Sequence, residues 1–590
     1  MADLERSTIL PEAELPAGAE LLAEGSRLAQ TFTVGRCPFL TTYDVPSESE
    51  YKRRRMAERA LMFHAQFGFR SPEKSRRAYA EIWERVAVAG YRVDRYGICL
   101  DWSMGYPAER RPGMPHGTGL ILESPEAFAA LTQGAPVAPH FGDFVIGMPA
   151  AVENTAAALA AGSTVIGNLG QYFTFKLPRW DDDVGTTAET VKALAMCAGQ
   201  SEEVLIHSNL DDGFASMFTD LACSVGTVLI ERAIVEDLVG GCVSHCYGHT
   251  FSDPLSRWAF QKALARVTDT PGSMVYGNTT IFVAEQVENY ANLASYLLVD
   301  LVAQHVEPTG HALNPVPVTE ALRIPEIDEI VDAHLFANRL ALRSGGFETL
   351  VDPARADEMA DRLVDGGWRF KQRVLEGLAE AGIDTEDPFE LLLALRRLGA
   401  RRLEALWGPG EAQEGAPRGR VPVVKATTVA ALESQGEGVV AALEETDRKE
   451  IGRAHLTACV TSTDVHEYGK ILVEAVLGQL GVEVVDAGVS ADPEEVAERA
   501  CGSASDLVAV STYSGIALRY LTELKEAMDR LGCDMPIFVG GKLNEVPEGS
   551  PSSLPEDVTR QLEELGAVVC LRVEDMLRRL VQIAKEANVA

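Results

Sequence analysis

Strand-like and helix-like runs alternate along most of this chain, and that alternation restricts the possible folds more than any other feature. From about residue 37 to residue 340, short apolar runs rich in β-branched residues alternate with Ala- and Leu-rich helical patterns. Such alternation is typical of a parallel sheet whose crossover connections are helices. A length of about 300 residues suits a (β/α)8 barrel. An open doubly wound sheet is the competing interpretation.

Several of the strand-like runs end in polar and ionisable residues. The strand-like runs are VLIHSNL (204–210), GGCVSHCYGH (240–249), GSMVYGN (272–278) and LVAQHVEPTGH (301–311), and helical examples are PAAVENTAAALAAG (149–162) and VENYANLASYLLVDLVA (287–303). In a parallel barrel the carboxyl ends of the strands form the active-site face. The sequence therefore predicts that polar residues at these run ends share one face, namely His207, Asn209, His245, His249, His305, Glu307 and His311. No pair of these histidines has a recognised metal-ligand spacing.

The chain divides into four segments by pattern. Residues 1–36 are expected to form a polar arm, 37–345 the barrel, 346–453 a helical extension and linker, and 454–590 a second α/β domain. The clearest boundary signal is the Gly-, Pro- and Glu-rich stretch WGPGEAQEGAPRGR at 407–420. A length of 590 residues with 46% hydrophobic residues supports more than one buried core.

Charge and cysteine usage exclude several classes of function. The formal net charge is −34, which disfavours binding to nucleic acid or to anionic membranes. The ten cysteines include no Cys-x-x-Cys pair, so neither a disulfide framework nor a cysteine-based metal site is expected. The N-terminus lacks the apolar segment of a signal peptide, and no run of 18 apolar residues is present. These features predict a cytoplasmic protein.

The C-terminal domain repeats a strand–helix unit of Rossmann or flavodoxin-like type. Its predicted strands are HLTACVTST (455–463), VEVVDAGV (482–489), SDLVAVST (505–512), MPIFVGG (535–541) and AVVCL. Three unusual features follow the carboxyl ends of these strands, where such folds bind ligands. They are Asp464-x-His466-x-x-Gly469, Ser511-Thr-Tyr513-Ser-Gly515 and Gly540-Gly541.

Here the chain resembles the cobalamin-binding domain shared by base-off, His-on mutases and methionine synthase. That family has Asp-x-His-x-x-Gly, then Ser-x-Leu, then Gly-Gly. In this chain 41 residues separate Gly469 from Ser511, and 26 separate Tyr513 from Gly540, which matches the family spacing. The one departure is Tyr513, which stands where the family usually has Leu.

The resemblance implies a role for each motif residue. His466 would take the axial position on cobalt that the cofactor's own base vacates, and Asp464 would accept a hydrogen bond from the other ring nitrogen. Ser511 would line the slot for the displaced base, and the glycines would leave room for it. The predicted cofactor-binding residues are Asp464, His466, Glu467, Tyr468, Gly469, Ser511, Tyr513, Ser514, Gly515, Gly540 and Gly541.

The segment 61–340 resembles the catalytic barrel subunit of glutamate mutase along its whole length. The similar points are Gly113-Met-Pro, Ala138-Pro-His140, Gly167-Asn-Leu-Gly170 with Pro178, Cys246-Tyr-Gly248, and Thr309-Gly-His311 with Pro317-Val-Thr-Glu320. A barrel followed by a cobalamin domain in one chain is also similar to 2-methyleneglutarate mutase. Methionine synthase instead places a helical cap with aromatic residues directly before its corrinoid domain, and the sequence contains no such pattern.

The resemblance implies an adenosylcobalamin-dependent radical carbon-skeleton mutase, an isomerase acting on a small carboxylic acid. Three departures argue against glutamate as the substrate, because Pro139, Leu169 and Pro308 replace the family's Arg, Glu and Lys. The alternatives are a corrinoid-dependent methyltransferase and a cobalamin carrier or sensor with a degenerate barrel.

The candidate residues for the chemistry lie on the barrel. The catalytic candidates are His140, Asn168, Gln171, Tyr172, His207, His245 and His311, with Asn209 and Asn278 as further polar groups. A substrate carboxylate could be held by an arginine, and the candidates are Arg70, Arg92 and Arg95. Related fused mutases suggest a homo-oligomer, and the expected partner is a small-molecule substrate.

Overall fold

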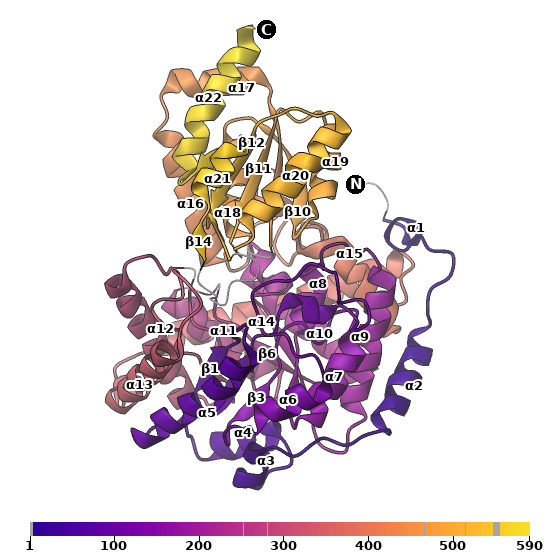
Figure 1. Cartoon of the computed structure of the whole chain (residues 1–590), viewed down its shortest axis with the longest axis vertical. Coiled ribbons are helices and arrows are strands. Elements are labelled where there is room, and N and C mark those ends of the chain that lie inside the picture. The colour runs from indigo at the N-terminus through magenta and orange to yellow at the C-terminus, as the bar shows by residue number, and fades with distance from the viewer. Residues whose placement is uncertain are drawn as a thin grey trace. The chain divides into compact units, whose positions relative to one another are not determined.

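A computed structural model of the chain describes residues 4–249, 251, 253–279, 281–464, 467–513, 515–546 and 555–589. The chain divides into two compact units (Figure 1). Unit 1 comprises Met1–Thr174 and Asp181–Thr427, and unit 2 comprises Phe175–Trp180 and Thr428–Ala590. Both units are mixed α/β.

Unit 1 contains short parallel strands that pair in chain order. Its described strands are β1 (His64–Phe67), β2 (Arg95–Ile98), β3 (Ala138–His140), β4 (Val165–Ile166), β5 (Leu205–Asn209), β6 (Cys242–Cys246), β7 (Met274–Val275) and β8 (Ala312–Leu313). Parallel ladders join β1–β2–β3, β4–β5–β6 and β7–β8. Single parallel bridges continue the order at Phe141–Ile166 and Tyr247–Val275, and Phe63–Leu313 links β8 to the start of β1.

Helices follow the strands of unit 1 and surround them. They are α5 (Pro72–Val88), α6 (Pro125–Thr132), α7 (Ala151–Ala160), α8 (Leu169–Thr174), α9 (Asp183–Ala198), α10 (Leu221–Arg232), α11 (Pro254–Val267), α12 (Gln286–Val306) and α13 (Ile327–Arg343). Before β1 come α1 (Arg6–Ile9), α2 (Gly18–Ala29), α3 (Pro38–Tyr43) and α4 (Glu48–Ala57), and after α13 come α14 (Ala354–Glu380) and α15 (Pro388–Trp407).

Local sequence signals explain where several of these helices begin. The Ser71 hydroxyl accepts the backbone N–H of Lys74, and Pro72 occupies the first turn of α5. Asp253 with Pro254 starts α11 in the same way, through the N–H of Ser256. A polar cap satisfies an N–H that has no partner within the helix, and proline costs nothing at this position.

Helix α14 belongs to the core of unit 1. Phe370 of α14 is fully buried in the same apolar cluster as residues of α10 and the strands. A Cβ placed on Gly226 of α10 would lie 2.5 Å from the Phe370 ring, and one on Gly367 of α14 would lie 2.8 Å from Val225. The two helices therefore approach so closely that only glycine fits at these positions.

Unit 2 is a five-stranded parallel sheet covered by helices on both faces. Its strands β9 (Thr457–Ser462), β10 (Glu483–Val489), β11 (Leu507–Thr512), β12 (Ile537–Gly541) and β15 (Val568–Cys570) lie in the order β10-β9-β11-β12-β15. The order reverses between β9 and β11, which is where such sheets bind ligands. Two short strands, β13 (Asn544–Glu545) and β14 (Glu556–Asp557), pair with each other.

The helices of unit 2 divide between the two faces of the sheet. They are α16 (Thr427–Ala441), α17 (Glu445–Ala454), α18 (Tyr468–Gln479), α19 (Pro493–Gly502), α20 (Ala517–Leu531), α21 (Thr559–Glu564) and α22 (Val573–Val589). One apolar cluster includes residues of α18 and α22, and a second includes residues of α19, α20 and α21. Figure 1 shows α17 beside α22, where Lys585 pairs with Asp447 at 3.0 Å.

Three features differ from the sequence predictions. LVAQHVEPTGH (301–311) is not a strand: it is mostly the end of α12, whose apolar residues follow helical spacing, and β8 starts only at Ala312. Unit 2 begins at Thr428, whereas the sequence predicted that the second domain starts at 454. The residues just before Thr428 belong to unit 1, where Asp220 accepts the N–H groups of Val423 and Val424. Cys501 and Cys533 form a disulfide.

Among the described residues, no helix has the length and hydropathy needed to cross a bilayer.

Candidate functional site

A cavity of about 390 Å³ lies in unit 2 between one face of the sheet and helices α18 and α22. It includes the carboxyl ends of β11 and β12, next to the point where the strand order reverses. Most of its lining is apolar, which suits a flat aromatic group more than a charged one. The lining residues are Gln435, Val460, Gly469, Lys470, Leu472, Val473, Ala509, Val510, Ser511, Phe538, Val539, Gly540, Gly541, Cys570, Leu571, Arg572, Val573, Glu574 and Met576.

The predicted glycines and serine meet at this cavity. A Cβ on Gly469 would lie 2.4 Å from the Ser511 hydroxyl, and a Cβ on Gly540 would lie 3.0 Å from the Cys570 carbonyl. Gly541 has a φ of +105°, and its Cβ would lie 2.2 Å from the Thr512 carbonyl oxygen. Gly541 therefore has no room for a side chain, while a side chain at Gly469 would displace the Ser511 hydroxyl and one at Gly540 would crowd the Cys570 carbonyl.

Asp464 is fixed at the carboxyl end of β9. Its side chain is 7% exposed, and Oδ2 accepts hydrogen bonds from the Thr463 hydroxyl and the Tyr513 backbone N–H, both at 3.1 Å. A carboxylate held in this way can orient a neighbouring imidazole. The imidazole that the sequence predicts for that role, His466, lies outside the described residues, as does Ser514.

The other predicted cofactor residues lie close by but outside the cavity lining. Glu467 caps α18 and Tyr468 is its first residue. The Tyr513 ring is 36% exposed and has the Lys542 ammonium 3.8 Å from its centroid. Gly515 has a φ of +73° in the turn before α20.

Lys470 is a residue of this region that the sequence reasoning missed. Its side chain is fully buried, and its ammonium lies 2.6 Å from Glu474, 2.8 Å from Asp486 and 3.4 Å from Glu467. It therefore ties the first turn of α18 to β10, directly after the motif glycine. The sequence shows that Lys470 directly follows the motif glycine, Gly469. It does not show that Asp486 of β10 lies beside the Lys470 ammonium.

A polar cluster forms at the carboxyl ends of β4 and β5 in unit 1. The Asn168 and Asn209 amides both donate to Asp212 Oδ2, at 2.9 and 3.0 Å. Asn168 Oδ1 accepts the N–H groups of Gly170 and Asn209. The structure thus brings two predicted residues together around a carboxylate that was not predicted.

A second carboxylate, Asp143, joins this cluster after β3. Gln171 holds it, donating to Asp143 Oδ1 at 3.3 Å and accepting the N–H of Phe144 at 2.9 Å. Desolvation, with the nearby negative charge of Asp212, raises the pKa of Asp143 to about 7. A carboxyl group with such a pKa can give or accept a proton near neutral pH.

The pKa of Tyr276 is also raised, by burial and then by the charges of Glu320, Asp212 and Asp143. This places Tyr276, at the carboxyl end of β7, in the same electrostatic environment. Buried Asn278 follows it after β7.

Three of the predicted histidines are buried among the strands. The His140 and His207 rings meet edge to face with centroids 4.5 Å apart, and His207 Nδ1 lies 2.7 Å from the Ser273 hydroxyl. His311 precedes β8, so it lies at the amino end of the strands, and burial lowers its pKa to about 3. The sequence had predicted that the polar residues at these run ends share one face. That prediction is wrong for His311, which lies at the opposite end of the strands.

His245 and Tyr172 point away from the polar cluster. His245 Nε2 lies 2.9 Å from Glu231 of α10. The Tyr172 hydroxyl bonds to Thr187 of α9 at 2.8 Å, and the ring is fully buried. His245 therefore connects β6 to α10, and Tyr172 connects α8 to α9.

The three candidate arginines have different surroundings. Arg95 is buried at the start of β2 and pairs with Glu48 at 2.8 Å. Arg92 pairs with Asp94, also at 2.8 Å. Arg70 follows the carboxyl end of β1, is half-buried, and forms no ion pair within the described chain. Of the three, Arg70 alone has a guanidinium that other side chains do not occupy.

Comparison with known proteins finds a family model that matches the C-terminal domain. Residues 455–581 match the B12 binding domain model. Methionine synthase of Mycobacterium tuberculosis is 24% identical over 190 residues, which is 31% of this chain and 15% of that protein's length. A solved structure of a novel cobalamin-binding protein from Desulfitobacterium hafniense is 18% identical with a TM-score of 0.20, covering 26% of this chain and 70% of that one. The match to the B12 binding domain model supports cobalamin binding by unit 2.

Proposed function

We propose that the protein is an adenosylcobalamin-dependent carbon-skeleton mutase in which unit 1 is a (β/α)8 barrel carrying the substrate site. The order of strand pairings supports the barrel, since parallel contacts run from β1 to β8 and from β8 back to the start of β1. The sequence resemblance to glutamate mutase over 61–340 supports the reaction class. The substrate is a small carboxylic acid other than glutamate.

The residues of unit 2 fit the proposed cofactor. The cavity offers an apolar slot next to the strand reversal, and three glycines and Ser511 keep its end clear of side chains. His466 would ligate the cobalt, and Asp464 would orient the His466 imidazole. The Asp464 carboxylate is already fixed by hydrogen bonds from Thr463 and Tyr513. When bound, adenosylcobalamin supplies the radical chemistry that no side chain can provide.

The observation that carries the mutase over a methyltransferase is the position of α14. In methionine synthase a helical cap with aromatic residues precedes the corrinoid domain. Here α14, with Phe370, is packed into the core of unit 1, and α16 and α17, which directly precede β9, contain no aromatic residue. The two helices directly before the domain therefore carry no aromatic ring, while α14 has one exposed aromatic ring, Trp368.

The polar cluster of unit 1 provides acid–base groups for the reaction. With a pKa of about 7, Asp143 is partly protonated at neutral pH and can give or accept a proton at its carboxyl oxygens. Asn168 and Asn209 hold Asp212 in place. Arg70 is the remaining candidate for a substrate carboxylate, since Arg92 and Arg95 are already paired.

The test is anaerobic mixing of the full chain with adenosylcobalamin and a panel of small carboxylic acids, followed by electron paramagnetic resonance. We expect a Co(II)–radical signal that requires both the cofactor and one acid. Arg70→Met should raise the KM for that acid about 10- to 100-fold, while the matched surface variant Arg77→Met, whose partner is Glu81, should not.

The methyltransferase is the second candidate, because methionine synthase is among the relatives. Consumption of methylcobalamin by a thiol or amine acceptor, with no radical signal from any acid, would establish it and refute the mutase. His466→Ala tests the cofactor assignment by itself. We expect loss of the nitrogen hyperfine splitting of the Co(II) signal or a sharp fall in cobalamin affinity.

A further inference from the structure

The one residue that departs from the cobalamin-binding motif, Tyr513, has a lysine lying over its ring. The Lys542 ammonium is 3.8 Å from the centroid of that ring. Tyr513 follows β11 and Lys542 follows β12, and these two strands pair with each other in the unit 2 sheet. Both residues therefore lie at the carboxyl edge of the sheet, where such folds bind ligands. We call Tyr513 and Lys542 the edge pair.

The backbone fixes the edge pair at the ends of both strands. The Tyr513 N–H donates to Asp464 Oδ2 at 3.1 Å. The Lys542 N–H donates to the Thr512 carbonyl oxygen at 2.8 Å. The next residue, Leu543, is 6% exposed and belongs to the apolar cluster of α19, α20 and α21. The sheet and its core therefore hold the two side chains beside each other.

The edge pair adjoins the cavity of unit 2. Ser511 and Gly541 line this cavity. Tyr513 comes two positions after the serine, and Lys542 directly follows the glycine. Asp464, which accepts the Tyr513 N–H, is the carboxylate proposed to orient the cobalt ligand. The edge pair is thus next to both that carboxylate and the cavity.

Cobalamin carries an anion between the two parts that these positions would hold. A phosphodiester joins the corrin ring, which holds the cobalt, to the ribose that bears the base, and it has one negative charge at neutral pH. With the base in the cavity and the cobalt bound through His466, the phosphate belongs near the carboxyl edge of the sheet, because it links the two. A lysine ammonium is a common binding group for phosphate.

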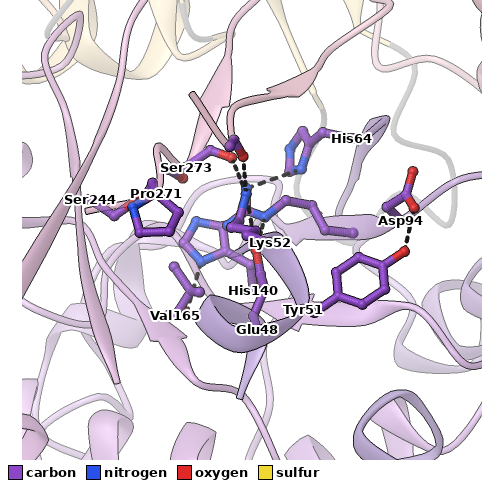
Figure 2. A network of polar contacts seen from close by, with 12 residues as sticks. Glu48, Tyr51, Lys52, His64, Asp94, His140, Val165, Ser244, Pro271 and Ser273 are labelled. Atoms are coloured by element: carbon purple, nitrogen blue, oxygen red, sulfur yellow. Dashed lines mark hydrogen bonds and ion pairs between the residues drawn. The ribbon is translucent and has the colours of Figure 1, made fainter. Parts of the chain in front are cut away.

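Two buried lysines elsewhere in the chain use their charge inside the fold. The Lys52 Nζ in unit 1 donates to three backbone carbonyl oxygens, among them that of Ser273 (Figure 2). Lys470, which lines the cavity, pairs with three carboxylates. The Lys542 side chain is half-buried, and its contact with the Tyr513 ring orients the ammonium without cancelling its charge. The edge pair therefore places an oriented positive charge beside the cavity.

We propose that Lys542 binds the phosphate of the cofactor's nucleotide tail and that Tyr513 orients the Lys542 ammonium for this contact. The proposal rests on the proposed binding of cobalamin by unit 2 and is independent of the reaction in unit 1. The free tail is flexible, so the phosphate is held at the edge only while the base fills the cavity. The tyrosine that replaces the family's leucine then serves cofactor recognition.

Arg572 is the competing cation, because it also lines the cavity. It follows β15, the last strand in the order β10-β9-β11-β12-β15. Lys542 follows β12 and is thus one strand nearer to β9, the strand that precedes Asp464 and His466. Lys542 is therefore the better placed cation for a phosphate that links the cobalt to the base.

The first test compares two ligands that differ in the tail. Adenosylcobalamin carries the phosphate and the base, and adenosylcobinamide carries neither. The Kd of each is measured by spectral titration of the full chain at low ionic strength, as wild type and as Lys542→Met. We expect the variant to bind adenosylcobalamin about 5- to 50-fold more weakly and adenosylcobinamide within about twofold of wild type, because only the first loses a charge-assisted contact. Raising the salt from about 20 to about 300 mM should reduce the difference between the two proteins, because screening weakens contacts between exposed charges.

Matched variants separate the charge, the ring and the competing cation. Lys542→Arg keeps the charge and should restore most of the affinity for adenosylcobalamin. Tyr513→Phe keeps the ring and should bind as wild type does, whereas Tyr513→Leu removes the ring and should lose about 2- to 5-fold. Arg572→Met should leave the ratio of the two Kd values unchanged.

Nuclear magnetic resonance of phosphorus-31 tests the contact without relying on affinity. Cobalamin contains one phosphorus atom, so the bound cofactor gives one resonance. In wild type labelled with nitrogen-15 lysine, dipolar dephasing in the solid state should show a lysine nitrogen within about 4 Å of that phosphorus. Lys542→Met should abolish the dephasing.

Three results would overturn the proposal. They are the absence of dephasing in wild type, an equal change in both Kd values or none in Lys542→Met, and a loss confined to adenosylcobalamin in Arg572→Met. If wild type bound neither ligand, the assignment of cobalamin to unit 2 would fail as well. If the Kd ratio responded to Lys542→Met but no acid gave a radical signal, the phosphate contact would stand and the mutase alone would be refuted.

Discussion

Filling the unit 2 cavity should abolish the contribution of the cofactor's displaced base to binding. Ala509 lies on the floor of the cavity, on β11, and its side chain packs on the same face as Phe538. Ala509→Phe would place an apolar ring inside a cavity of about 390 Å³, where a phenyl group has room. We therefore expect unit 2 to stay folded while the slot is blocked.

The size of the effect follows from the area that the base would bury. An aromatic group of this kind buries about 150–250 Å². At about 25 cal/mol per Å² this corresponds to about 4–6 kcal/mol, or about 10³- to 10⁴-fold in Kd. Ordering the tail upon binding reduces the net gain, so a loss of at least about 100-fold is the expected outcome.

The assay compares two ligands with two proteins. Adenosylcobalamin carries the base and adenosylcobinamide does not, and the Kd of each is measured by spectral titration with wild type and with Ala509→Phe. Wild type should bind adenosylcobalamin at least about 100-fold more tightly, and the variant should bind both ligands equally weakly. If the variant kept the preference for adenosylcobalamin, or if wild type had none, the cavity would not be the base's binding site.

Three further perturbations test other parts of the structure. The raised pKa of Asp143 means that the folded chain retains a proton between about pH 4 and 7 that the unfolded chain has lost, so wild type should lose unfolding free energy as the pH rises through this window. Asp143→Asn should make this pH-dependent fall in unfolding free energy smaller by about 1–3 kcal/mol. Urea unfolding of wild type and variant at pH 4.5 and pH 8 measures the difference, and the same fall in both proteins would contradict a raised pKa at Asp143. Lys470→Met removes the buried ammonium that pairs with Glu474, Asp486 and Glu467 and should destabilise unit 2 by about 3 kcal/mol. Lys449→Met on the surface should cost under about 0.5 kcal/mol. Gly367→Val overpacks α10 against α14 and should cost about 2 kcal/mol in the unfolding of unit 1; a neutral result would mean that α14 does not belong to that core.

Much of unit 2 could be predicted from the sequence because its signals are local. The runs at 482–489 and 505–512 became β10 and β11 within one or two residues, since each is a short apolar run bounded by a turn. Gly469, Gly540 and Gly541 line the cavity, because strand order in such a sheet decides which loops meet, and their role in cofactor binding stays a prediction. His466, the central residue of the motif, lies outside the described residues and stays a prediction.

Unit 1 was harder because its site depends on contacts between distant segments. Asp143 and Asp212 are 69 positions apart in the sequence, and no spacing rule connects them. Arg95 was considered for a substrate carboxylate because it lies near where the resembled mutase family keeps arginines, but Glu48, from a helix before the first strand, pairs with it. His311 was assigned to a carboxyl end because the end of α12 was read as a strand, since a short apolar run does not distinguish the two structures.

The proposed function assigns cofactor binding to unit 2 and proton transfer to unit 1. The unit 2 cavity is lined only by residues of unit 2, and the carboxyl groups of Asp143 and Asp212 belong to unit 1. Variants at the polar cluster should therefore change the rate and its pH dependence while leaving the Kd for adenosylcobalamin within about twofold. Conversely, Ala509→Phe should lower affinity without moving the pH at which the reaction is half-maximal. If Asp143→Asn weakened cobalamin binding as strongly as Ala509→Phe, the two sites would be coupled and this division of roles would be wrong.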